Sequence, residues 1–135
     1  MRGILPATWS GPLMSVMRIV FGLFFLMHGT QKYFNWPAAM PMEVEVVSWF
    51  GLAGILELVG GTLMILGLFT RPVAFVLAGE MAVAYFMVHI PNGGIWPLNN
   101  GGEPAALYCF AFLFFAAAGP GTIAIDKPHM DPSKH

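Results

Sequence analysis

Ionisable side chains lie inside or at the edge of long apolar segments of this chain. They are Arg18, His28, Lys32, Glu57, Glu80 and His89. A charge at the centre of a bilayer costs about 2.5–3.5 kcal/mol even on lenient insertion scales, so such groups face the interior of a helix bundle and pair there. The chemistry that the fold must position is therefore ligand binding or proton handling inside an apolar medium.

The heights of three charged residues along their segments predict how they pair. Measured from one end of the expected helices, Arg18 lies about 7 Å deep, Glu80 about 13 Å and Glu57 about 18 Å. Arg18 is therefore expected to pair with Glu80 and to reach toward Glu57. One cation cannot neutralise two carboxylates, so one of them is expected to hold a proton. The structural alternative is an Arg18–Glu80 ion pair that only fixes helix register.

One face of the first apolar segment carries a polar seam. Its members follow 4-3-4-3 spacing and share a helix face: Arg18, Gly22, Phe25, Gly29 and Lys32. His28 lies beside this stripe, one turn from Lys32. The seam predicts an inward-facing polar surface that another helix or a flat ligand approaches at the glycines. The alternative is that Lys32 extends outward to the interface and His28 bonds a neighbouring carbonyl.

Composition identifies the medium. The chain has 135 residues, 57% of them hydrophobic and only 10% charged, whereas soluble domains carry about 25% charged residues. Lipid is therefore the expected solvent. The net charge is −1 and there is no basic run, so nucleic acid is not an expected partner. Cys109 is the single cysteine, which excludes a disulfide within the chain. The first apolar stretch runs on to Phe34, which is too long for a cleaved signal peptide.

Four apolar segments are expected to be membrane helices. A helix needs ~20 residues to cross ~30 Å of hydrocarbon, and the segments cover about 13–33, 48–69, 72–90 and 104–118. They do not alternate as barrel strands do, and lipid requires their backbone to be satisfied internally. The sequence predicts one all-α domain over 1–135, an integral membrane four-helix bundle. Thr70-Arg71 is expected to be a short link, and Trp36 and Trp96 are expected to anchor two longer loops at the interface.

Charge placement predicts the orientation. With four spans, both termini share a side with the link between the second and third helices. The basic residues on that side are Arg2, Arg71, Lys127 and Lys134. The charged residues on the other side are Lys32, Glu43, Glu45 and Glu103. The positive-inside rule then places both termini in the cytoplasm, for a multi-pass protein of the inner (plasma) membrane.

Four stretches together resemble the DoxX family of small bacterial membrane proteins. They are RIVFGLFFLMHGTQKYF, LELVGGTLMILGLFTRP, EMAVAYFMVH and WPLNNGGEPAALYCFAFLFFAAAGPG. The resemblance implies a four-helix membrane bundle associated with redox processes, since relatives resemble the small quinone-reducing subunit of thiosulfate:quinone oxidoreductase. The residues to which it gives weight are Arg18, His28, Gly29, Lys32, Glu57, Gly60, Gly61, Arg71, Pro72, Glu80, Asn100, Gly101, Gly102 and Glu103.

The sequence leaves several functions open. The favoured hypothesis is an accessory or assembly subunit of a membrane redox system that binds a small apolar ligand. The first alternative is a quinone-reducing subunit, for which a redox partner must supply electrons. Others are a b-type haem site between His28 and His89, which is the least favoured cofactor, and a small-solute transporter, which needs a homo-oligomer. No metal site is predicted. The candidate ligand residues at the outer loops are Trp36, Tyr85, His89, Asn100 and Glu103.

Overall fold

The computed structural model describes residues 3–127. Arg2 and Lys134, two of the basic residues used to predict the orientation, lie outside this range. Every regular element in the described part is helical, which confirms the all-α prediction. The four main helices are α1 (Ser10–Phe34), α2 (Trp49–Leu66), α3 (Thr70–Ala84) and α6 (Glu103–Ala118). The short elements are a 3-10 turn (Ala7–Trp9), a π-helical turn (Tyr85–His89), α4 (Ile90–Gly93) and α5 (Pro97–Asn100).

Within residues 3–127, three helical stretches are long and apolar enough to cross a membrane, namely Ala7–Phe34, Trp49–Leu66 and Thr70–Gly93. The fourth, Glu103–Ala118, is apolar but has only 16 residues, a length of ~24 Å. The third predicted helix therefore continues through the π-helical turn and α4. Of the segment 91–103, predicted to be a loop, part is helical, because Ile90–Gly93 and Pro97–Asn100 each form one turn.

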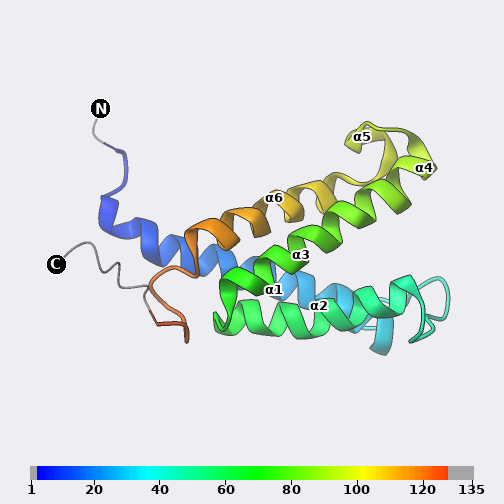
Figure 1. The fold of residues 1–135 in the computed structure, drawn as a ribbon, viewed down its shortest axis with the longest axis horizontal. Coiled ribbons are helices and arrows are strands. Elements are labelled where there is room, and N and C mark those ends of the chain that lie inside the picture. Colours follow the sequence, from blue (N-terminus) through cyan, green and yellow to red (C-terminus); the bar gives the residue numbers. More distant parts are fainter. Residues whose placement is uncertain (1–2, 128–135) are drawn as a thin grey trace.

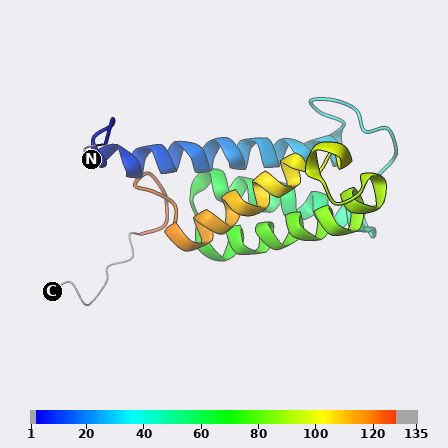
Figure 2. The same ribbon diagram turned by 90° about the horizontal axis from the view of Figure 1, so that it is seen from above.

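The bundle consists of two pairs of helices, α1 with α2 and α3 with α6 (Figure 1). At one end, called the terminal end, lie the first residues of α1 and α3 and the last residues of α2 and α6. The other end, called the loop end, holds the connection 35–48 and the short helices α4 and α5 (Figure 1). Figure 2 shows α6 crossing beside α1 at an angle, so the two pairs are not parallel.

The contact between α1 and α2 is made by backbone against backbone. A Cβ atom on Gly61 would lie 2.8 Å from the amide nitrogen of Leu26 and 3.0 Å from the carbonyl oxygen of Gly22. On the same face, a Cβ on Gly29 would lie 2.8 Å from the amide nitrogen of Leu58. Small residues drive close helix association in lipid, where packing replaces the hydrophobic effect. The glycines of the predicted seam therefore serve the α1–α2 contact.

The contact between α2 and α3 includes a close glycine–leucine pair. A Cβ on Gly60 would lie 2.6 Å from the Cδ2 atom of Leu77, which is fully buried against it. Beyond this point the two helices diverge toward the loop end (Figure 1). The pairs are joined near the middle by aromatic side chains, with ring centroids 5.0 Å apart for Phe25 and Phe112 and 5.6 Å apart for Phe21 and Tyr108.

The turn between α2 and α3 lies at 67–69 and not at the predicted Thr70-Arg71. Gly67 adopts a left-handed conformation (φ 65°), its amide bonds the Met64 carbonyl, and the Leu68 amide bonds the Leu63 carbonyl. This is the Schellman arrangement that ends helices at glycine. It ends α2 three residues before the predicted position, and Thr70 becomes the first residue of α3.

The segment 119–127 folds back over the terminal end, a feature that the sequence analysis did not predict. The Ile125 amide donates to the Leu66 carbonyl at 3.2 Å, and the Asp126 amide donates to the Gly67 carbonyl at 2.8 Å. The carboxylate of Asp126 accepts hydrogen bonds from the amides of Phe69 and Thr70, both at 2.8 Å. These are free amides of a helix N-terminus, which an acidic group stabilises. The segment therefore joins α2 to α3.

We expect Gly61→Ala to loosen the α1–α2 contact and to lower the free energy of unfolding by about 1–3 kcal/mol, because the added methyl meets backbone atoms that cannot move aside. Gly79→Ala is the matched control, since a Cβ there meets nothing within 4 Å. Reversible unfolding in mixed detergent micelles measures both. Equal stability of the two variants would contradict the backbone contact.

Asp126 predicts a pH dependence of stability. Burial alone raises the pKa of Asp126, but the amides of Thr70 and Phe69 and the charge of Arg18 outweigh it and hold the pKa below its usual value. The carboxylate therefore stabilises the fold above the unfolded-state pKa of about 3.9, and this contribution is lost as the pH falls through the folded-state pKa. Asp126→Ala should cost about 1 kcal/mol at neutral pH, and unfolding curves of the two proteins should converge in acid. A difference independent of pH would refute the assignment.

Candidate functional site

A cavity of about 730 Å³ lies between the two helix pairs, on the loop-end side of the Gly60–Leu77 contact. Its wall is mostly apolar, with Ala53 and Leu56 from α2 and Val83 from α3. Two of these lining residues, Leu56 and Val83, are 38% and 50% exposed. The cavity is therefore not sealed from the medium that surrounds the helices.

The polar wall of the cavity contains an ion pair between α1 and α2. The ammonium of Lys32 donates to both carboxylate oxygens of Glu57, at 2.9 and 2.7 Å. The two side chains are only 12% and 5% exposed. Lys32 therefore points into the bundle, and the alternative that it extends outward is wrong. It is the only ion pair among residues 3–127.

Glu80 lies on the opposite wall, on α3, and also lines the cavity. Both of its carboxylate oxygens are shielded from the surface, and neither has a hydrogen-bond partner in the described part of the chain. The predicted Arg18–Glu80 ion pair is therefore wrong. Glu80 faces the cavity without the cation that the sequence assigned to it.

Arg18 binds backbone carbonyls at the terminal end instead. Its guanidinium donates to the carbonyls of Met64 (2.7 Å), Pro120 (2.5 Å) and Ile123 (2.8 Å). The Cα–Cβ bond of a helical residue tilts toward the helix N-terminus, which directs this side chain away from Glu80. There it meets the carbonyl of Met64 in the last turn of α2, the end of a helix that attracts a cation. Arg18 is thus completely buried but lies outside the cavity.

Arg71 plays a similar part on the surface. Its guanidinium donates to the Ala116 carbonyl at 3.3 Å and to the Ala117 carbonyl, both in the last turn of α6. Cations at helix C-termini satisfy carbonyls that have no partner within the helix. Arg71 therefore holds α3 to α6 and, like Arg18, has a structural position.

His28 and Tyr108 form a further part of the cavity wall. Their rings meet edge to face, with centroids 6.1 Å apart, and both residues line the cavity. A smaller groove of about 320 Å³ lies against the same two residues, beside Phe24 and Gln31. Sequence reasoning missed Tyr108. The 4-3 spacing of Tyr108, Phe112 and Phe115 was a signal that could have placed it on the buried face of α6.

The candidate residues of the outer loops divide into three groups. Only His89 lines the cavity. The Tyr85 hydroxyl donates to the Ile95 carbonyl, and Asn100 donates to Gly94 (2.8 Å) and accepts from the Gly102 amide (2.7 Å). Tyr85 and Asn100 therefore fix the path of 90–102.

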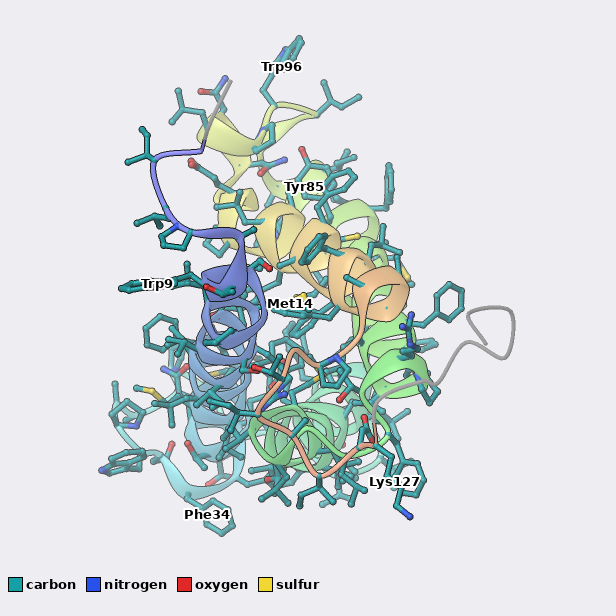
Figure 3. All side chains as sticks on the ribbon, turned by 90° about the vertical axis from the view of Figure 1, so that its left-hand side faces the viewer. Trp9, Met14, Phe34, Tyr85, Trp96 and Lys127 are labelled. Atoms are coloured by element: carbon teal, nitrogen blue, oxygen red, sulfur yellow. The ribbon has the colours of Figure 1, made fainter. Side chains whose placement is uncertain are left out.

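The other two candidates, Trp36 and Glu103, lie on the outer surface, as does the expected anchor Trp96. Trp36 and Trp96 are 60% and 70% exposed, and Glu103 is exposed in the first turn of α6. Figure 3 shows Trp96 at the periphery, beyond Tyr85 and pointing away from the helices. None of the three lines the cavity. Trp36 and Trp96 are in positions typical of interfacial anchors.

Comparison with known proteins identifies the family of this chain. The sequence model of the DoxX family matches residues 13–90, more than half of the chain. The chain belongs to the DoxX family. It is 43% identical over 118 residues to an uncharacterized protein of Haemophilus influenzae, an alignment that covers 84% of this chain and 88% of that relative.

Two more distant DoxX relatives are described as membrane proteins. An uncharacterized membrane protein of Mycobacterium tuberculosis is 28% identical over 131 residues, covering 86% of this chain and 80% of its own. The inner membrane protein YphA of Escherichia coli is 26% identical over 129 residues, an alignment that covers 85% of this chain and 89% of YphA. No solved structure matches the chain significantly. This DoxX protein is therefore a membrane protein, and the predicted bilayer environment is confirmed.

We expect Lys32→Met to lower the free energy of unfolding by about 3 kcal/mol, because it leaves Glu57 buried without its cation. The double variant Lys32→Met/Glu57→Leu should recover most of this loss, since an apolar pair of similar volume replaces the ion pair. Unfolding in mixed micelles measures the free energy of unfolding of the native protein and of both variants. An unchanged stability of Lys32→Met would show that the ion pair is not formed.

Proposed function

We propose that this protein binds a small amphipathic molecule that enters the cavity sideways from the bilayer, and that it does so as an accessory subunit of a membrane redox system. The observation that carries the proposal is the cavity between α2 and α3, apolar at its mouth and lined with Lys32, Glu57 and Glu80 within. An apolar tail would lie against the mouth and a polar end against the charged residues.

The dimensions of the cavity support ligand binding. Its volume of about 730 Å³ falls within the range of about 300–1,000 Å³ that is typical of small-molecule sites. Such sites are mostly apolar, with a few polar groups that orient the ligand. Ionisable groups in membrane helices are rare, because a charge without a partner is unfavourable there, and they therefore mark functional sites. The cavity has both properties.

The remaining parts of the proposal concern location and partner. We place the protein in the inner membrane with both termini in the cytoplasm, since Arg71 and Lys127 belong to the terminal end and one relative is named an inner membrane protein. The redox connection rests on the resemblance to DoxX proteins of membrane oxidoreductase assemblies. The chain carries no flavin or nicotinamide fingerprint, so electrons would come from a partner.

Reduction of a quinone is the second candidate. A quinone needs a flat apolar slot and a donor for each carbonyl, and the cavity combines the His28 and Tyr108 rings with the Lys32 ammonium. Cys109 is the single cysteine of the chain, so a thiol pair within it cannot deliver electrons. The quinone would then be reduced with electrons from the partner.

We expect lipid-soluble molecules to co-purify with the protein in mild detergent, and Ala53→Phe to reduce their amount about tenfold by filling the cavity, a change that corresponds to ~1.4 kcal/mol. Ile55→Phe is the matched control, because Ile55 lies on the same helix, is 40% exposed and does not line the cavity. Mass spectrometry of solvent extracts measures the amounts.

The identity of the extracted molecule separates the candidates. A quinone retained by the native protein and lost in Ala53→Phe would favour quinone reduction, and another amphiphile would favour a binding subunit. Haem, a further alternative between His28 and His89, would give a Soret band. Equal extracts from the native protein and both variants would contradict the proposed site.

A further inference from the structure

Glu80 is the one acid of the cavity wall that lacks a partner among the described residues. Both of its oxygens are shielded and make no hydrogen bond. The other titratable groups that line the same cavity are Lys32, Glu57, His28, His89 and Tyr108. Glu80 is therefore the group whose hydrogen-bonding capacity the protein itself leaves unused.

The charge balance of the cavity wall decides the form of Glu80. The Lys32 ammonium is already balanced by Glu57, whose two oxygens both accept from it. An ionised carboxylate with no cation and no donor is very unfavourable in an apolar medium, and such a group takes up a proton instead. A protonated carboxyl has one O–H donor. In Glu80 that donor faces the cavity.

The adjacent cation points to the same ligand chemistry. An ammonium has three N–H donors, and Glu57 accepts two of those of Lys32. Lys32 also lines the cavity, so its ammonium is a second donor group at this wall. The polar wall thus offers donors from two sides, and a positive charge on a ligand would meet the Lys32 ammonium.

We propose that Glu80 is the specificity-determining residue of this site: as a neutral acid it donates a hydrogen bond to an acceptor oxygen on an uncharged amphiphile. The inference rests on the proposed function and adds the class of ligand to it. The site then accepts a long-chain molecule with a carbonyl oxygen at its polar end and rejects an alkylamine of the same length. No proton leaves Glu80 on binding, because the group acts as a donor and not as an acid.

The test compares two probes of matched length, 2-tridecanone and dodecylamine, on the full chain in lipid nanodiscs. We expect the ketone to bind the native protein and Glu80→Gln with affinities within about threefold, because the amide keeps a donor. Glu80→Leu should lower the affinity for the ketone about tenfold, because one hydrogen bond is lost. Glu103→Gln is the control for charge, since Glu103 lies outside the cavity.

Two results would overturn the role of Glu80. One is ketone binding to Glu80→Leu at the native affinity, while Ala53→Phe still reduces it; the cavity would then be a ligand site without this specificity. The other is tighter binding of dodecylamine than of the ketone, which would make Glu80 an ionised cation site. If neither probe binds in a manner that Ala53→Phe reduces, the proposed function itself fails and this inference with it.

Infrared difference spectroscopy gives a second readout, whose main result comes from the native protein. The native protein at neutral pH should show the carbonyl band of a protonated carboxyl, and 2-tridecanone labelled with ¹³C at its carbonyl should shift that band on binding. The band should be missing in Glu80→Gln. Its absence from the native protein would overturn the proposal.

Discussion

The ion pair between Lys32 and Glu57 is the interaction on which the rest of the site depends. It joins α1 to α2 at the cavity wall, and both Glu57 oxygens accept from the one ammonium. In lipid a charge must find a partner inside the bundle, and this pair engages Lys32, the one Lys or Arg among residues 3–127 that lines the cavity with Glu80. The unpartnered acid, the donor-rich wall and the proposed ligand class all follow from that assignment.

The two ends of the bundle differ because their polar groups are satisfied differently. At the terminal end, Arg18 and Asp126 bind free backbone groups of α2, α3 and the segment 119–127, so the helices are held together. Toward the loop end the helix pairs separate beyond Gly60 and Leu77 (Figure 1). A closed base and an open lateral mouth are what a site for a membrane-dissolved molecule requires.

The sequence predicted the helices better than their contacts. Apolar length located all four main helices of residues 3–127, and the predicted start of α6 differs by one residue from Glu103. The turn after α2 was misplaced because Gly67 ends the helix and Asp126, 56 residues from Thr70, caps the next one. Heights along the helices suggested Arg18 as the partner of Glu80, yet the direction of a helical side chain decides its neighbours.

The pairing of α1 with α2 and of α3 with α6 was beyond sequence reasoning, since four apolar helices of similar composition can pack in several ways. The most direct test of the lateral site is an experimental structure of the protein in lipid nanodiscs. The account predicts an elongated non-protein density between α2 and α3, with its polar end beside Lys32 and Glu80. Helices α2 and α3 packed along their full length, with Lys32 turned toward the lipid headgroups, would contradict it.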